Sequence, residues 1–550
     1  MKILIVGGVA GGATAAARMR RLGEEHEIVL FERGGYVSFA NCGLPYHIGE
    51  VIKDREKLLL QTPQSLKERY GLDVRIRQEV LAIDPENKNI QVKNLTTDEI
   101  YTESYDKLLL SPGAAPFVPP IPGIQSSKIF TLRNIHDMDK IIESARKAKH
   151  VVVVGGGFIG LEVAENLIEA GKAVTLVELS NQVMAPVDFE FARMVEGVAK
   201  SHGLSVKLNA GVTAFEESAN GISVTLNSGE TIETEGVVFA IGVRPENALA
   251  RQAGLEIGQT GGIKVNAYLQ TSQPDIYAVG DAIEVSHLVG DQKVLIPLAW
   301  PANRQGRIVA DNMIQGHRFT FKGALGTSIL KFFEYTVGAT GLNEKTLKRW
   351  NIPYKTITVT RGNHAGYYPG STNIVLKLIF SEKGALLGAQ AFGKEGVDKR
   401  IDVISTAIKG KLTVHDLADI EVAYAPPYNS AKDPVNIAGY AAQNLLEGTL
   451  RTINVEDLPT FLKQDGVVLV DVRTAKEFDN GHIPDAINME LDTLRENISF
   501  FDPSKTYVLT CQVGLRGYLA HRILQHHGIA SYSLNGGYGL WQVVNEGKIH

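Results

Sequence analysis

Two glycine-rich turns, each directly after a short apolar run, constrain the fold more than any other feature of the sequence. One turn follows the run KILIVG at residues 2–7, and the other follows VVVV at residues 151–154. A glycine turn between a buried parallel strand and a helix places backbone N–H groups where a dinucleotide pyrophosphate binds. Two such turns, 148 residues apart, predict two Rossmann-like α/β domains in one chain.

The residues of both turns fit this interpretation. We expect a helix at Ala13–Leu22 after the first turn, and a helix that opens directly after the second. The first turn has Val9 where the fingerprint usually has its second glycine, whereas the second turn matches G-x-G-x-x-G in full. The candidate cofactor-binding residues of the turns are Gly7, Gly8, Ala10, Gly11 and Gly12 in the first and Gly155, Gly157 and Gly160 in the second.

An acidic residue follows each turn at the spacing of a ribose ligand. A strand expected at Glu27–Phe31 ends at Glu32, which is 25 residues after Gly7, and Glu178 lies 23 residues after Gly155. Such a carboxylate accepts hydrogen bonds from ribose hydroxyls. Because it also repels a 2′-phosphate, Glu178 favours NADH, with NADPH possible.

Composition narrows the class of protein further. At roughly 150 residues per domain, 550 residues predict about four domains. The net charge of −5 gives no support for nucleic-acid binding, and no window of the sequence resembles a membrane span. The N-terminal run could pass for a signal peptide, but its glycines and the basic helix that follows fit a nucleotide-binding unit better. We therefore expect a cytoplasmic protein.

The chain has only two cysteines, Cys42 and Cys511. This count excludes a disulfide scaffold and a thiolate zinc site, and we predict no metal. Two scarce, distant thiols suit a reducing compartment, where each can be reactive.

Three further segments resemble the flavoproteins that carry two dinucleotide-binding domains. They are residues 271–281, which end in Ala278-Val279-Gly280-Asp281, and the crossover segments at residues 105–113 and 239–247. The resemblance implies FAD as a cofactor, with Asp281 bonded to its ribitol chain. The other candidate cofactor residues in these segments and after the first ribose strand are Gly113, Gly280 and Arg33.

Cys42 lies in the segment SFANCGLPY, residues 38–46, and has no second cysteine nearby. This segment resembles the coenzyme A-disulfide reductases, and the resemblance spans roughly residues 1–445. It implies that Cys42 is the nucleophile, which holds CoA in a mixed disulfide. Related NADH peroxidases and oxidases typically carry a His in the first glycine loop, where this chain has Ala10.

The same resemblance implies a CoA site and a homodimer. Arg18 and Arg21 lie three residues apart on one helix face and can clamp phosphates, although a solvated basic face is the simpler interpretation. Tyr367 and Tyr424 would reach the partner subunit's active site, whereas for Tyr368 and Tyr428 we favour exposed interface residues. The candidate CoA contacts are Thr14, Arg18, Arg21, Ser38, Asn41, Asn303 and Lys432.

The C-terminal part resembles rhodanese. Strands expected at Val467–Asp471 and Tyr507–Thr510 are followed by the six-residue loop from Cys511 to Arg516, and then by a helix at Tyr518–His526. A thiol in a strand-to-helix loop meets backbone N–H groups that stabilise a persulfide anion. The resemblance implies that Cys511 carries sulfane sulfur, and Arg516 would orient an anionic sulfur donor.

These observations predict a flavoprotein that reduces CoA persulfide or polysulfide and releases hydrogen sulfide. One alternative is a reductase of CoA disulfide, and another is a redox sensor whose rhodanese is only a docking module. The predicted domains are FAD-binding at residues 1–110 and 240–322, NAD(P)H-binding at 111–239, dimerisation at 323–445, a linker at 446–458 and rhodanese at 459–550.

Overall fold

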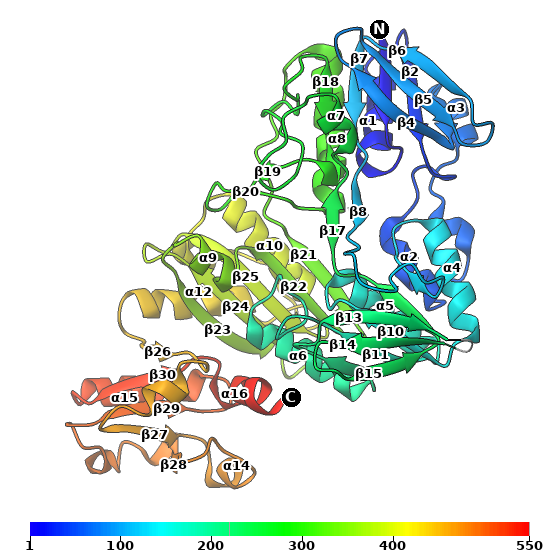
Figure 1. The fold of residues 1–550 in the computed structure, drawn as a ribbon. Coiled ribbons are helices and arrows are strands. Elements are labelled where there is room, and N and C mark those ends of the chain that lie inside the picture. Colours follow the sequence, from blue (N-terminus) through cyan, green and yellow to red (C-terminus); the bar gives the residue numbers. More distant parts are fainter. Residues whose placement is uncertain (219–220, 549–550) are drawn as a thin grey trace. The chain divides into compact units, whose positions relative to one another are not determined.

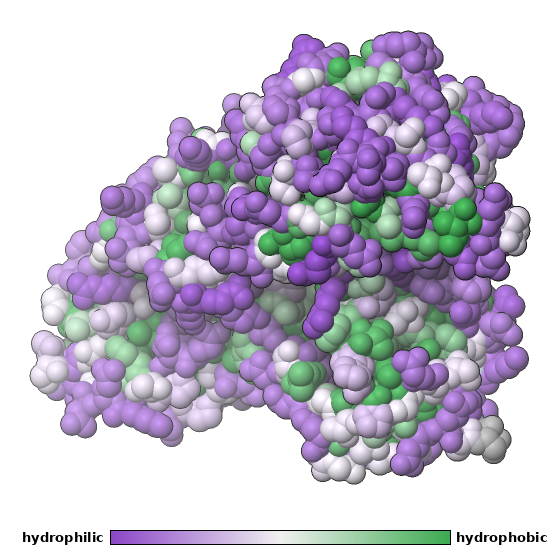
Figure 2. Space-filling view, turned by 45° about the horizontal axis from the view of Figure 1, so that its top comes forward, coloured by the Kyte–Doolittle hydropathy of each residue, from purple (hydrophilic) through white to green (hydrophobic). Residues whose placement is uncertain are grey.

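The computed structural model describes residues 1–218 and 221–548, and these form two compact units (Figure 1). Of the described residues, the first unit comprises 1–181, 204–218 and 221–326, and the second comprises 182–203 and 327–548. Figure 2 shows a surface on which hydrophilic residues predominate and hydrophobic ones gather in small groups. No helix among the described residues is long and apolar enough to cross a membrane.

The first glycine turn belongs to a parallel sheet of order β18-β7-β1-β2-β3. Its strands are β1 (Lys2–Val6), β2 (Glu27–Glu32), β3 (Asp73–Ile76), β7 (Lys107–Leu110) and β18 (Ile276–Ala278). Because the apolar side chains of β1 and β7 are buried on both faces, they form the core of this sheet. Helices α1 (Ala10–Arg20) and α8 (Ala299–Gln315) pack against each other. The remaining helices of this part are α3 (Pro63–Tyr70) and α7 (Ala248–Gln252).

The second glycine turn belongs to a parallel sheet of order β12-β11-β10-β16-β9. Its strands are β9 (Ile129–Phe130), β10 (His150–Val154), β11 (Ala173–Val177), β12 (Ser205–Lys207) and β16 (Gly236–Phe239). Helices α4 (Ile135–Lys147) and α5 (Phe158–Glu169) accompany it, and α2 (Leu44–Ile48) packs against both. The two parallel sheets confirm the predicted pair of Rossmann-like domains.

Smaller antiparallel sheets complete the first unit. One contains β4 (Gln78–Asp84), β5 (Asn89–Asn94) and β6 (Ile100–Ser104), and another contains β13 (Val212–Glu217), β14 (Ile222–Leu226) and β15 (Thr231–Thr234). The two-stranded pairs are β8 (Ala114–Pro116) with β17 (Val243–Pro245), and β19 (Val285–Ser286) with β20 (Lys293–Val294).

The second unit begins with an antiparallel sheet of order β21-β22-β25-β24-β23. Its strands are β21 (Ser328–Phe332), β22 (Tyr335–Gly341), β23 (Lys355–Gly362), β24 (Asn373–Phe380) and β25 (Leu386–Gly393). The helices of this part are α6 (Phe189–Ser201), α9 (Glu344–Arg349), α10 (Val397–Lys409), α11 (Val414–Asp419) and α12 (Pro434–Leu446).

A parallel sheet of order β26-β30-β29-β27-β28 forms the C-terminal part of this unit, coloured orange to red in Figure 1. Its strands are β26 (Thr452–Ile453), β27 (Val467–Asp471), β28 (Ile487–Asn488), β29 (Thr506–Thr510) and β30 (Ala530–Leu534). The helices are α13 (Leu458–Phe461), α14 (Ala475–Asp479), α15 (Leu515–His526) and α16 (Gly537–Glu546).

Two helices begin three residues earlier than the sequence predicted. Helix α1 begins at Ala10 and ends at Arg20, because the N–H of Ala13 already donates to the carbonyl of Val9 (3.0 Å). Helix α15 begins at Leu515, because Gly514 adopts a φ of 104° that turns the chain directly into the helix. The prediction for α15 was wrong in a way that affects the site, since Arg516 lies in the first helical turn.

Candidate active site

Each glycine turn is fixed to its own acidic residue. The N–H of Gly8 donates to Glu32 Oε2 (3.0 Å), and the N–H of Gly156 donates to Glu178 Oε2 (2.7 Å). A Cβ added at Gly12 would lie 1.9 Å from the carbonyl oxygen of Gly7, so only glycine lets α1 approach the turn this closely. Gly160 meets the carbonyl of Gly155 at the same distance.

Both turns fit the dinucleotides that the fold implies. Neither α1 nor α5 has a side-chain cap or an acidic residue in its first turn, so their first N–H groups can bind a pyrophosphate. A Cβ at Gly113 or Gly157 would meet nothing within 4 Å, which leaves room for a ligand beside the backbone. Residues of the first turn would hold FAD, and residues of the second would hold the nicotinamide cofactor.

Asp281 lies at the end of the flavin motif, in the short helical turn Gly280–Ala282. The N–H of Gly280 donates to Gln305 Oε1 on α8 (2.7 Å), which fixes the turn. Burial raises the pKa of Asp281 to about 6. A half-buried carboxyl of this kind can accept a hydrogen bond from a hydroxyl, and the ribitol chain of FAD would supply one.

Arg33, which follows the first ribose strand, forms ion pairs in this structure. Its guanidinium pairs with Glu246 (3.0 Å) and Glu79 (3.5 Å). Arg133 pairs with the same Glu246 at 2.8 Å. Arg33 therefore anchors the segment after β2 to the second crossover.

Cys42 lies in a short helical turn, Asn41–Gly43, that leads directly into α2. The N–H of Ser38 donates to the carbonyl of Gly8 (2.8 Å), so the cysteine segment is tied to the first glycine turn. Cys42 is exposed. Its thiol is therefore presented to a reactant beside the turn that would hold FAD.

The protein around Cys42 favours a protonated thiol. Loss of hydration around the thiol raises the pKa of Cys42, and the negative charges of Glu162 and Asp281 raise it further. Glu162 lies in α5, directly after the second glycine turn, and its carboxyl is hydrogen-bonded to the side chain of Tyr46. Burial raises the pKa of Glu162 to about 7. Sequence analysis missed Glu162 and Tyr46, although Tyr46 stands in the cysteine motif and Glu162 in the first turns of α5.

Four of the candidate CoA contacts lie on α1, at its C-cap or on α8. Thr14 donates to Asn303 Oδ1 (2.7 Å), so these two predicted contacts meet. Arg18 is paired with the buried Asp311 through two bonds of 2.7 and 3.2 Å, whereas Arg21 is exposed. Asn41 is exposed beside Cys42, and Lys432 is exposed in the second unit. Asp311 therefore holds the guanidinium of Arg18 in a fixed position.

Tyr367 and Tyr424 meet in the second unit, and their hydroxyl oxygens are 2.9 Å apart. Both are strongly exposed, at 76% and 50%, as are Tyr368 and Tyr428. Two exposed phenol groups that are hydrogen-bonded to each other are available to contact a second molecule.

A buried arginine that sequence analysis missed holds the two tyrosine loops together. Arg400 donates to the carbonyl of Asn363 (2.8 Å) and to Asn429 Oδ1 (3.1 Å), and it pairs with Asp433 (2.9 Å). Asn363 precedes the loop of Tyr367, and Asn429 follows the loop of Tyr424. The only hint in the sequence was a charged residue in an apolar helix face.

Cys511 lies at the end of β29, and its side chain is buried. Its Sγ accepts bonds from the backbone N–H groups of Gly514 (3.2 Å) and Gly517 (3.3 Å). These are backbone N–H donors of the kind that the sequence predicted around the thiol. Arg516, however, forms a two-bond ion pair with Glu477, at 2.6 and 2.7 Å.

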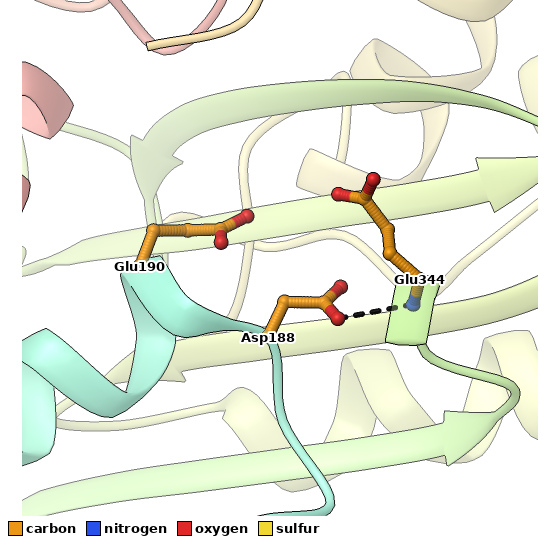
Figure 3. A group of neighbouring side chains, drawn as sticks. All are labelled: Asp188, Glu190 and Glu344. Carbon is orange, nitrogen blue, oxygen red and sulfur yellow. Dashed lines mark hydrogen bonds between the residues drawn. The ribbon is translucent and has the colours of Figure 1, made fainter. Parts of the chain in front are cut away.

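A third group of charged residues has no counterpart in the sequence predictions. Figure 3 shows Asp188, Glu190 and Glu344 brought together from the starts of α6 and α9. The ammonium of Lys377 on β24 contacts all three carboxylates, so it occupies the position where a metal ion would bind. Burial opposes the charged form, but the attraction of Glu190, Asp188 and Glu344 outweighs it and raises the pKa of Lys377. Lys377 is therefore the cation of this cluster.

Comparison with known families identifies the class of protein. Residues 1–306 match the pyridine nucleotide-disulphide oxidoreductases, and residues 327–434 match the dimerisation domain of that family. Residues 454–543 match the rhodanese-like domain. The chain therefore belongs to the pyridine nucleotide-disulphide oxidoreductases and carries a C-terminal rhodanese-like domain. This confirms the predicted fold class and an oxidoreductase that uses FAD and NAD(P)H.

Individual relatives within this family show more specifically which proteins the chain is similar to. The coenzyme A disulfide reductase of Staphylococcus aureus strain JH9 is 39% identical over 445 residues, which cover 80% of this chain and 100% of that protein. The structure of reduced CoADR-RHD from Bacillus anthracis has 51% identity and a TM-score of 0.97, and the match covers 99% of this chain and 98% of that one. An NAD-dependent persulfide reductase from A. fulgidus has 34% identity and a TM-score of 0.93, covering 98% and 100%.

Proposed function

We propose that this chain is an NADH-dependent flavoprotein that reduces CoA persulfide and releases hydrogen sulfide. The observation that carries the proposal is that the chain has two thiols in two different environments. Cys42 is exposed beside the first glycine turn, and Cys511 is enclosed by backbone N–H groups that suit a persulfide. The similarity to a coenzyme A disulfide reductase and to a persulfide reductase supports this substrate class.

The reaction divides into two steps at Cys42. Its thiolate attacks the CoA sulfur of CoA-S-SH, so the S–S bond breaks, hydrosulfide leaves and a Cys42–CoA disulfide forms. When bound, FAD supplies two electrons from NADH to this disulfide. Reduction then returns the Cys42 thiolate and releases CoA thiol, and the net change converts CoA persulfide, NADH and a proton into CoA, hydrogen sulfide and NAD⁺.

The chain's own residues set up these steps. Glu162 and Tyr46 hold a carboxyl and a phenol beside the Cys42 segment, with the pKa of Glu162 at about 7 and that of Tyr46 at about 12. A carboxyl that titrates near neutral pH can give or take the proton that the thiol exchanges. Cys511 would deliver or accept sulfane sulfur, and CoA would carry the sulfur between the two thiols on its long arm.

The proposal assigns a role to each part of the chain. FAD would bind residues 1–110 and 240–322, and NADH would bind residues 111–239. Residues 323–445 would pair two subunits into a homodimer, and residues 459–550 would carry sulfur after the linker at 446–458. We also propose that the protein works in the cytoplasm, where thiols stay reduced.

The test compares acceptors for NADH oxidation in one set of assays: CoA persulfide, CoA disulfide, polysulfide and oxygen. The proposal predicts that CoA persulfide gives the highest kcat/KM and one sulfide per NADH. A higher kcat/KM for CoA disulfide would favour the alternative in which the enzyme maintains CoA thiols. No turnover with any sulfur acceptor would favour the redox-sensor alternative.

Cofactor preference depends on Glu178. Its carboxylate accepts bonds from Gly156 and Ser180, so it is fixed at the end of β11 where the adenosine ribose would bind. We expect at least a several-fold preference for NADH over NADPH in kcat/KM, because the carboxylate repels a 2′-phosphate. In Glu178→Ala this preference is expected to disappear. Equal activity of the unmodified enzyme with both cofactors would contradict the role of Glu178.

Tyr424 is expected to act as a proton donor to the leaving thiolate in the partner subunit's active site. Tyr424→Phe should therefore lower kcat more than it raises KM, because a proton donor acts mainly in the transition state. Tyr440→Phe, on the exposed face of α12, is the matched control and should leave both constants unchanged. An active monomer in light scattering at assay concentration would refute the shared site.

A further inference from the structure

Arg516, the cation at the end of the Cys511 loop, is neutralised by Glu477. Two bonds of 2.6 and 2.7 Å join the guanidinium to the carboxylate. Glu477 is itself fixed in the first turn of α14, where it accepts bonds from the N–H (3.1 Å) and the hydroxyl (2.9 Å) of Thr474. The bond from Arg516 lowers the pKa of Glu477 to about 2, so the carboxylate is charged at every physiological pH.

The second arginine near the loop is also fully engaged. Arg473 is buried, pairs with Asp471 (2.7 Å) and donates to the carbonyl of Gly481 (2.7 Å). Its guanidinium also donates to Gln512 Oε1 (3.2 Å) and lies 4.1 Å from the centre of the Tyr538 ring. Neither arginine therefore offers a free positive charge to a small dianion at the loop.

The two exposed side chains within residues 511–520 are both apolar instead. Leu515, the first residue of α15, is 45% exposed, and Leu519 is 42% exposed one helical turn later. Residues four apart lie on the same face of a helix, so the two side chains form one apolar rim beside the Cys511 loop. An aliphatic chain can pack on such a rim, whereas a sulfonate-like group cannot.

From this arrangement we infer that Cys511 prefers an organic persulfide with an aliphatic arm to inorganic thiosulfate as its sulfur donor, and that Glu477 enforces this preference. The inference rests on the proposed role of Cys511 as a sulfur carrier. The Cys511 thiolate attacks the outer sulfur of R-S-SH, the S–S bond breaks, R-S⁻ leaves and Cys511-S-SH forms. Attack on thiosulfate would instead expel sulfite, a dianion that needs a free cation for its binding and departure.

Glu477→Gln tests the inference in the full-length chain with Cys42→Ser, so that only Cys511 can accept sulfur. Gln keeps the capping bonds to Thr474 but frees Arg516 from its counter-charge. We expect the rate of sulfur loading from thiosulfate, followed by intact mass as one added sulfur atom, to rise about tenfold. Loading from CoA persulfide should stay within about twofold. Glu496→Gln, an exposed acid of the same domain, is the charge-matched control and should change neither rate.

Two further variants make the result decisive. Adding Arg516→Gln to Glu477→Gln should remove the gain with thiosulfate, because the freed cation is lost. Leu519→Ser changes an exposed side chain, so it should not disturb folding. It should slow loading from CoA persulfide several-fold relative to loading from thiosulfate. Thiosulfate loading as fast as persulfide loading in the parent chain would overturn the inference, as would a Glu477→Gln variant with no gain. If Cys511 loads as expected in the Cys42→Ser chain, but the enzyme with Cys42 intact does not reduce CoA persulfide with NADH, only the proposed reductase function is refuted.

Discussion

Cys42→Ser is expected to abolish NADH-dependent reduction of CoA persulfide, CoA disulfide and polysulfide alike. Cys42 is the thiol that stands beside the first glycine turn, and a serine hydroxyl cannot form the mixed disulfide with CoA. The loss should exceed about a thousandfold, as is usual when the nucleophile of a covalent mechanism is removed. NADH oxidation and sulfide release measure the effect.

Cys511→Ser is the matched control in this experiment. It should leave reduction of directly supplied CoA persulfide intact, and slow the reaction only when sulfur must first be taken from elemental sulfur, polysulfide or a protein donor. Loss of free CoA persulfide reduction in Cys511→Ser, with FAD content unchanged, would mean that the rhodanese thiol acts inside the main catalytic cycle.

Lys377→Met is expected to lower the free energy of unfolding by about 3–5 kcal/mol, because it leaves three buried carboxylates without their cation. Lys377 is 2% exposed, and its ammonium lies 3.0 Å from Asp188 and in contact with Glu190 and Glu344. Asp188 also accepts the backbone N–H of Glu344 (3.0 Å), so repulsion would disturb the starts of both α6 and α9. Urea unfolding followed by circular dichroism measures the change.

Lys348→Met provides the comparison, since Lys348 is exposed and lies 3.9 Å from the same Glu344. Because Lys348 is exposed and only at the edge of contact distance, its pair with Glu344 should contribute only about 0–1 kcal/mol. Adding Glu190→Gln to Lys377→Met should restore part of the stability, because it removes one uncompensated charge. A loss no larger for Lys377→Met than for Lys348→Met would contradict the role of the buried cation.

The dinucleotide fold and the two thiols were predictable because they depend on local sequence. A glycine turn after an apolar strand has few alternatives, and the structure places Glu32 and Glu178 on their own turns as the spacing implied. The hydrogen bonding of the Cys511 loop was equally predictable, because its N–H donors come from neighbouring residues.

The features that the sequence did not reveal all depend on contacts between distant segments. The partners of Lys377 lie 33 to 189 residues away along the chain, and Arg400 joins loops that precede and follow it. The sequence indicated that Arg516 ends the Cys511 loop. It did not reveal the ion pair with Glu477, because Glu477 lies 39 residues upstream. Glu162 was hidden because its significance comes from burial and from Tyr46, and a sequence shows neither.

The most direct test of the proposed mechanism is a single turnover of enzyme that holds oxidised FAD and a free Cys42 thiol, freed of any bound CoA, with one equivalent of CoA persulfide, first without NADH. The proposed mechanism predicts that one sulfide is released per Cys42, and that intact-mass and peptide analysis find CoA attached to Cys42. Adding one equivalent of NADH should then release CoA and restore the unmodified mass. Sulfide released only after NADH is added, or CoA found on Cys511 instead of Cys42, would contradict the account.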